Sequence, residues 1–138
     1  MYNGPHENSL SAGLGAMQNK FEITFEGDLV KVISEGEKDY RFLERLWTEV
    51  VAVCNEYDCH KVLGIARTTK HVEALEGLEL AQLFRELNVT RKFRLAWVEH
   101  NQEARHIVDF IETVLSNRGL PGRAFDTEEE AREWLARD

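Results

Sequence analysis

The chain has 138 residues, of which 43% are hydrophobic and 30% charged, a balance typical of one globular domain with a single core. Its formal net charge of −8 argues against binding to nucleic acid or an anionic membrane surface, because both need a basic face. There is no apolar run of the roughly 18 residues that spans a bilayer and no signal-peptide pattern, and two cysteines are too few for a disulfide framework. We therefore expect a cytoplasmic protein without membrane insertion and without a nucleic-acid partner.

Residues 1–18 are rich in Gly, Ser and Asn and show no hydrophobic period, so we expect a flexible leader before a single domain at 19–138. Apolar and polar residues then alternate over 21–25, and a second apolar-rich run covers 29–33. Gly27-Asp28 joins the two runs. Because glycine adopts the positive φ that a tight turn between strands requires, this pattern predicts a β-hairpin.

From Tyr40 to Tyr57 the apolar residues recur every three or four positions, which indicates an amphipathic helix. A short apolar run over 61–66 follows and is typical of a strand buried on both faces. The helix therefore connects the hairpin to this strand in a β-α-β unit, whose strands are parallel and whose crossover is right-handed.

The rest of the chain continues the alternation of helix and strand. In order, we expect a helix over 72–87 ended by Asn88, a strand over 91–98, a helix capped by Asn101, a strand over 123–125 and a helix capped by Thr127. The predicted order is a hairpin followed by βαβαβα winding. The fold class is therefore α/β, with about five strands and four helices in one mixed sheet.

The hairpin, the repeated βα winding and above all the ending Arg123-Ala-Phe-Asp-Thr-Glu-Glu-Glu-Ala-Arg-Glu-Trp-Leu135 resemble the SpoIIAA-like proteins. These are STAS-like domains, related in fold to bacterial anti-sigma-factor antagonists and compared with lipid-binding Sec14-type domains. The resemblance covers 20–136 and rests on a packing motif, a phenylalanine strand followed by an acidic capped helix. It implies a (βα)n superhelix with helices largely on one sheet face. The other face, or a groove beside it, would serve self-association or an apolar ligand.

Polar residues follow the buried strand at 61–66, where we expect the chain to turn into the next helix. They are Arg67, Thr68, Thr69, Lys70 and His71. Free N–H groups and the positive end of the helix dipole would make this place an anion or phosphate site, or present a hydroxyl to a kinase. Alternatively, one threonine is only an N-cap and the cations are solvated.

In the anti-sigma antagonists, a phosphorylatable serine follows the third strand in an Asp-Ser-Ser/Thr-Gly turn. The equivalent neighbourhood here runs from Arg67 to Lys70 and has neither the Asp nor the Gly. The resemblance makes Thr68 and Thr69 candidate phosphate acceptors by their location alone.

His100 and Asn101 follow the next strand of the predicted parallel set, and ligands gather at the carboxyl ends of such strands. We expect them to line one cleft together with Thr68 and Thr69. Glu99 is placed to exchange a proton with His100. No nucleophile accompanies this pair at a fixed spacing, so we expect no catalytic residues, no enzymatic activity and no cofactor.

Two further residue classes point to structure more than to chemistry. Cys54, Cys59 and His60 lack the additional ligand of a closed zinc site, so we expect no metal, and Cys54 lies on the apolar helix face as a core residue. The three tryptophans also suit a core. Trp97 is the exception, because its alternating strand leaves it facing either the helices or the open side of the sheet.

Three hypotheses of function follow. The first, taken from the resemblance, is a non-catalytic bacterial regulatory domain that binds a protein partner and forms a homodimer. The second is a carrier or sensor of a small apolar or amphipathic ligand, held between the helices and the sheet. The third is a switch operated by phosphorylation of Thr68 or Thr69.

Overall fold

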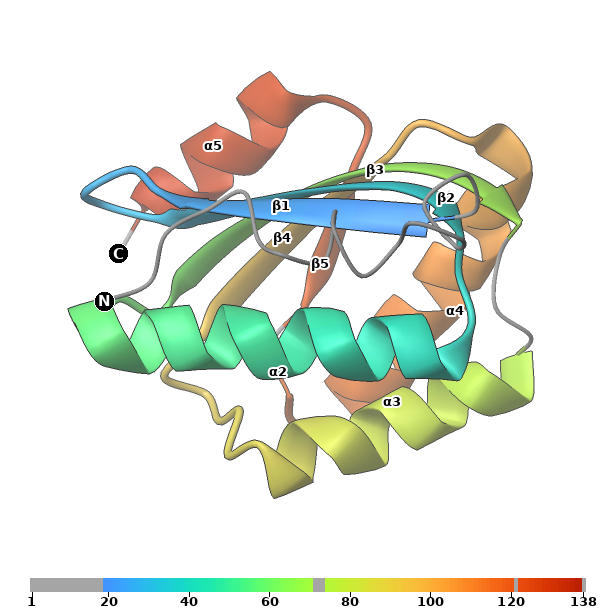
Figure 1. Cartoon of the computed structure of the whole chain (residues 1–138), viewed down its shortest axis with the longest axis horizontal. Helices are drawn as coiled ribbons and strands as arrows, with labels where there is room; N and C mark the ends of the chain where they lie inside the picture. The colour runs from blue at the N-terminus through green and yellow to red at the C-terminus, as the bar shows by residue number, and fades with distance from the viewer. Residues whose placement is uncertain (1–18, 71–73, 121, 138) are drawn as a thin grey trace.

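The computed structural model describes residues 19–70, 74–120 and 122–137, so the predicted leader and His71 lie outside the described residues. Five strands and four helices form in the described part of the chain. They are β1 (Asn19–Phe25), β2 (Val30–Glu37), α2 (Tyr40–Tyr57), β3 (Lys61–Lys70), α3 (Ala74–Glu86), β4 (Arg94–Glu99), α4 (Gln102–Asn117), β5 (Arg123–Phe125) and α5 (Glu128–Ala136). This order confirms the predicted α/β fold (Figure 1).

The five strands form one mixed sheet in the order β1-β2-β3-β4-β5. β1 pairs antiparallel with β2, and every later pair is parallel. The hairpin turn is the predicted Gly27-Asp28 pair, with φ of 92° at Gly27, closed by a hydrogen bond from Glu26 N–H to the Leu29 carbonyl. Because each crossover steps to the next strand in one direction, the carboxyl ends of β2, β3 and β4 meet at one edge.

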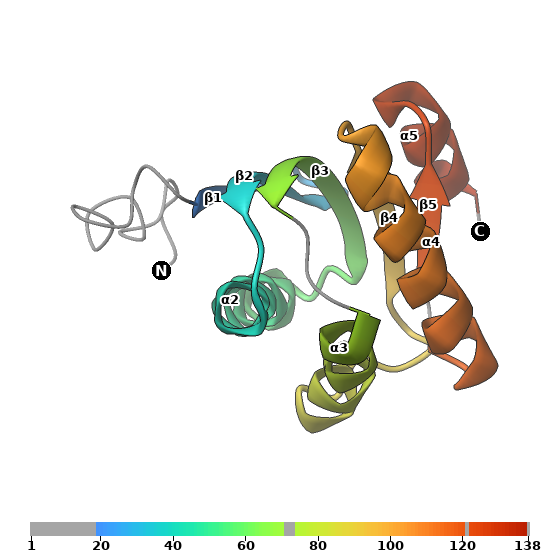
Figure 2. The same ribbon diagram turned by 90° about the vertical axis from the view of Figure 1, so that its right-hand side faces the viewer.

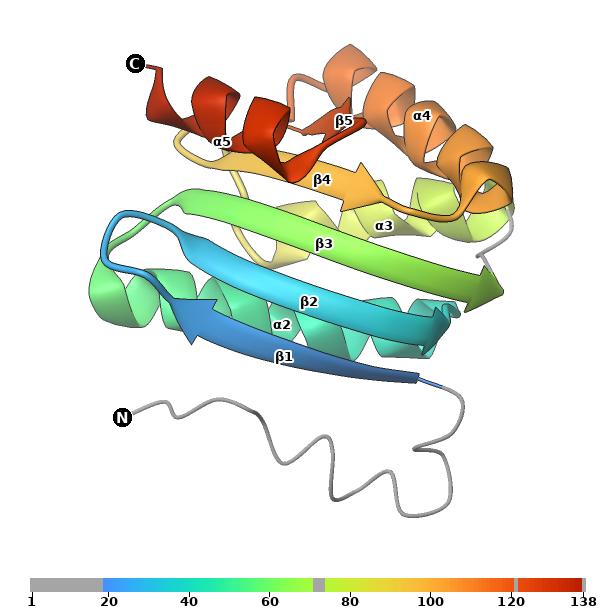
Figure 3. The same cartoon turned by 90° about the horizontal axis from the view of Figure 1, so that it is seen from above.

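Helices α2 and α3 lie on one face of the sheet, where α4 joins them, and α5 lies on the opposite face (Figures 1 and 2). The large core between the sheet and α2–α4 contains Phe42, Leu46, Trp47 and Phe84. A smaller core under α5 is built around Leu63, Ala131 and Leu135. Figure 3 shows that α5 crosses β4 and leaves β1 and β2 without a described helix in front of them.

Local sequence explains where the helices begin and end. Asp39 caps α2 by accepting a hydrogen bond from Phe42 N–H at 2.8 Å, and Asn101 caps α4 by accepting from Glu103 and Ala104. Asn88, after α3, takes a left-handed conformation with φ of 61°, as expected of a helix terminator. Thr127 caps α5 by accepting a hydrogen bond from Glu130 N–H at 3.1 Å. The predicted caps of α4 and α5 are both confirmed.

The boundary between β3 and the next helix was predicted wrongly. The sequence places a strand end and a helix start at 67–69, whereas β3 continues through to Lys70. Pairing explains the extension: Gly36 lies opposite Thr68, and Glu37 lies opposite Lys70 after a register shift that leaves Thr69 as an extra residue in β3. Thr68 and Thr69 are therefore strand residues, and neither is the N-cap of a helix.

Candidate functional site

A buried carboxylate at the carboxyl edge of the sheet collects four hydrogen bonds. Oε1 of Glu99 accepts from the Thr68 hydroxyl at 2.5 Å and from the Lys38 ammonium at 3.4 Å. Oε2 accepts from the backbone N–H groups of Thr68, at 3.0 Å, and Asn101, at 3.2 Å. The side chain of Glu99 is 0% exposed, and both of its oxygens are fully engaged as acceptors.

Lys38, in the connection between β2 and α2, supplies the cation of this cluster. Its side chain is 9% exposed, and its ammonium lies 5.0 Å from the centre of the Trp97 ring. The backbone N–H of Lys38 donates to the Lys70 carbonyl at 2.6 Å, which fixes the connection to the end of β3. Burial lowers the pKa of Lys38, and the ion pair with Glu99 opposes that effect only in part.

Several of the residues predicted from the sequence lie together here. The side-chain amide of Asn101 donates to the Thr68 carbonyl, and the His100 N–H donates to the Ala66 carbonyl. The ends of β3 and β4 therefore form the shared edge that the strand order predicts. Thr68 is 3% exposed and turned toward the helices.

The other predicted residues do not join this cluster. Arg67, Thr69, Lys70 and His100 are exposed, and Arg67 and Thr69 alternate with Thr68 along the strand, on its opposite face. The first described residue of α3 is Ala74. The helix start predicted directly after Thr69 is therefore wrong, since β3 runs to Lys70, whereas ligand binding by Arg67, Thr69 and Lys70 stays a prediction.

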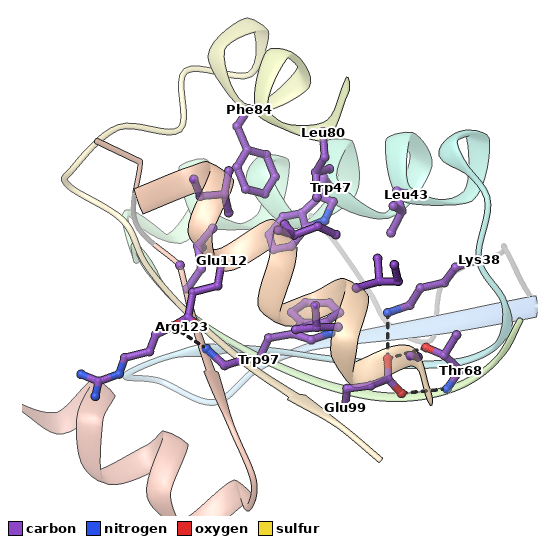
Figure 4. Close-up of a pocket in the computed structure, with 18 residues that line it drawn as sticks. Lys38, Leu43, Trp47, Thr68, Leu80, Phe84, Trp97, Glu99, Glu112 and Arg123 are labelled. Atoms are coloured by element: carbon purple, nitrogen blue, oxygen red, sulfur yellow. Dashed lines mark hydrogen bonds and ion pairs between the residues drawn. The ribbon is translucent and has the colours of Figure 1, made fainter. Parts of the chain in front are cut away.

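A cavity opens beside the cluster, between the sheet and helices α2, α3 and α4 (Figure 4). Apolar side chains make up most of its wall, among them Leu43, Trp47, Leu80, Phe84, Leu95, Trp97, Ile107, Val108 and Ile111. Lys38, Thr68 and Glu99 gather at one end, and Glu112 and Arg123 lie toward the other. The cavity is thus apolar along its length and polar at its ends.

Helix packing explains why this space exists. α3 packs against α2 and α4 and stands away from the sheet (Figure 2). Trp97 fills part of the gap from the sheet side, with its ring centre 5.4 Å from that of Trp47. The remaining cavity has a volume of about 80 Å³, several times the roughly 10–15 Å³ that one water molecule needs.

Sequence reasoning missed Lys38 and took the cavity wall for a filled core. The rule that places sites at the carboxyl ends of parallel strands was applied to β3 and β4 but not to β2, whose end leads directly into Lys38. The half-buried state of Ile107 and Ile111 left no trace in the sequence, because their spacing is that of any helix with an apolar face. Trp97 faces the helices; the alternation of its strand could not decide between this orientation and the open side of the sheet.

Cys54 is a core residue, as its position on the apolar helix face predicts. It is buried in the core, and burial raises the pKa of its thiol to about 12, so the thiol stays protonated and unreactive at neutral pH. Among residues 19–70, 74–120 and 122–137, no helix combines the length and hydrophobicity required to cross a membrane.

No family model matches the chain, and no curated protein matches it. The site is therefore interpreted from its own geometry.

Proposed function

We propose that this protein is a non-catalytic carrier or sensor that binds a small apolar or amphipathic molecule in the cavity between the sheet and helices α2, α3 and α4. The observation that carries the proposal is the cavity itself, an apolar space next to a buried polar cluster. Ligand sites in proteins combine these same two parts, since apolar walls supply affinity and a few polar groups fix orientation. This proposal corresponds to the second hypothesis drawn from the sequence.

The polar cluster supports binding more than catalysis. A general base needs a free lone pair within reach of the proton that it removes. The four lone-pair positions of the Glu99 carboxylate are occupied by N–H and O–H donors, and the hydroxyl proton of Thr68 is directed to Glu99. Neither side chain is therefore poised to act as a base or a nucleophile.

The other two hypotheses receive less support. Thr68 is buried and hydrogen-bonded, which favours a structural role over phosphorylation, so the exposed Thr69 is the phosphate acceptor that this hypothesis would need. On the sheet face that α5 leaves open, β1 and β2 present Glu22, Thr24, Lys31 and Glu35 around one exposed apolar residue, Ile33. This composition gives little apolar area for a homodimer. Regulation of a bacterial protein partner, which the SpoIIAA-like resemblance implies, would act through ligand occupancy.

Native mass spectrometry with a cavity-blocking variant tests the proposal. Val108, half-buried on α4, lines the cavity, so Val108→Phe would fill it; His106→Phe adds the same ring to the exposed side of this helix and serves as the control. We expect the freshly purified protein and the control to retain a small molecule that Val108→Phe lacks. A protein that carries nothing, and whose Trp47 and Trp97 indole resonances do not respond to added cyclopentane, would overturn the proposal.

A further inference from the structure

At the polar end of the cavity, some groups have all of their hydrogen-bonding capacity filled within the protein and one group does not. Glu99 has no acceptor capacity left, and the Thr68 hydroxyl proton is committed to it. Lys38 differs, because an ammonium has three N–H donors and, among the described residues, its only hydrogen-bond acceptor is Glu99 Oε1. Two N–H donors of this buried ammonium are therefore left for a ligand in the cavity, whose wall Lys38 lines.

The charge of the cluster selects among ligand head groups. Lys38 and Glu99 form an ion pair 3.4 Å apart, so their charges already cancel. A ligand carboxylate beside Lys38 would also lie near the Glu99 carboxylate and leave a net negative charge in an apolar surrounding, which is costly. A ligand ammonium would be repelled by Lys38 itself. An uncharged acceptor oxygen meets neither penalty.

The size of the cavity limits the body of the ligand. Its volume of about 80 Å³ is roughly half that of the engineered 150 Å³ apolar cavity that holds benzene. A short or single-ring hydrocarbon group suits this space, with any longer part extending through the open side. The rings of Trp47, Phe84 and Trp97 give flat apolar walls against which such a group can pack.

From these observations we infer that the ligand is an uncharged molecule with a small hydrocarbon body and one acceptor oxygen, such as a ketone, ester or alcohol, and that this oxygen accepts a hydrogen bond from Lys38 Nζ. This inference rests on the proposed function and adds the chemical class of the ligand. Lys38 is the specificity-determining residue, and Glu99 is a positioning residue that holds the ammonium at the cavity wall.

Three probes that share one ring test the inference: cyclopentanone, cyclopentane and cyclopentanecarboxylate. The readout is the indole N–H resonances in ¹⁵N-labelled protein, because Trp47 and Trp97 line the cavity. Trp134, which belongs to α5 and packs against the smaller core on the other face of the sheet, serves as an internal control. We expect cyclopentanone to shift the Trp47 and Trp97 resonances with roughly tenfold higher affinity than cyclopentane, as one hydrogen bond to a charged donor would give. Cyclopentanecarboxylate should bind more weakly than the ketone.

Lys38→Met keeps the length of the side chain and removes its donors, so it should bind ketone and hydrocarbon equally. If cyclopentane binds and cyclopentanone gains nothing over it, or if the carboxylate binds best, the inference is overturned while the proposed function stands. If none of the probes shifts Trp47 or Trp97, the inference is overturned, and the proposed function falls with it when the purified protein also carries no small molecule. The ranking in the unsubstituted protein decides the matter even if Lys38→Met does not fold.

Discussion

The indole ring of Trp97 lies directly over Gly64 of the neighbouring strand. The two residues are register partners between β3 and β4, and a Cβ atom on Gly64 would lie 2.0 Å from Cε3 of Trp97. The missing side chain of Gly64 therefore makes the space in which the indole lies flat against the sheet. That position lets Trp97 form the floor of the cavity without closing it.

Gly64→Ala should destabilise the protein by about 1–3 kcal/mol, because the added methyl group collides with the half-buried Trp97 ring, which must shift into the cavity. Urea unfolding measures this loss. In a Trp97→Leu background the methyl group has no ring to displace, and the same substitution should cost clearly less. An equal cost in both backgrounds would show that the contact with Trp97 is not responsible.

Thr68→Val should lower the free energy of unfolding by about 1–3 kcal/mol, because it keeps the shape of the side chain and removes a hydroxyl donor from the buried Glu99 carboxylate. Thr69→Val is the matched control, since Thr69 is exposed on the same strand, and its effect should stay within about 0.5 kcal/mol. Denaturant unfolding compares the two variants. Similar effects at both positions would contradict the assigned role of Thr68.

Stability at alkaline pH should report the burial of Lys38. Its pKa in the folded protein lies below the usual value of 10.5, so between the two values the unfolded chain binds more protons than the folded one. The free energy of unfolding contributed by this group therefore rises as the pH increases toward 10.5.

The measurement is the difference in free energy of unfolding between the unsubstituted protein and Lys38→Met, in which the titrations of groups common to both proteins cancel. This difference should increase over the interval in favour of the unsubstituted protein. A relative loss would mean that the attraction of Glu99 outweighs the burial of the ammonium.

Arg94→Lys should loosen the attachment of α5. The Arg94 guanidinium lies 4.2 Å from the centre of the Trp134 ring and donates to the Trp134 carbonyl at 2.6 Å. An ammonium cannot reproduce this stacked, planar contact, and we expect a loss of about 1–2 kcal/mol. Hydrogen exchange should accelerate in α5 and not in α2, whereas Arg85→Lys on the exposed side of α3 should change neither.

The order of the elements was predictable because each element carries a strong local signal. The alternation at 21–25, the helical period from Tyr40 and the caps Asn101 and Thr127 are all short-range patterns, and each formed as predicted. The end of β3 was not predictable from local signals. Polar residues after an apolar run favour a turn, but pairing with the end of β2, across a register shift at Thr69, keeps the chain extended to Lys70.

The site was predicted in part for a similar reason. Strand order alone places Thr68 beside Asn101, so this proximity followed from the topology. The role of Lys38 depends on how the β2–α2 connection folds back over Trp97, and the cavity depends on how far α3 stands from the sheet. Both are consequences of tertiary packing, which local sequence patterns do not predict.

The placement of Glu99 also constrains how the strands can align. A shift of β4 by one residue would turn every side chain of that strand to the opposite face of the sheet. Glu99 would then point toward α5, among Leu63 and Ile65, and the ammonium of Lys38 would lose its counter-ion. One acidic side chain at the tip of β4 thus penalises misaligned chains and favours a unique alignment of the three parallel strand ends that surround it.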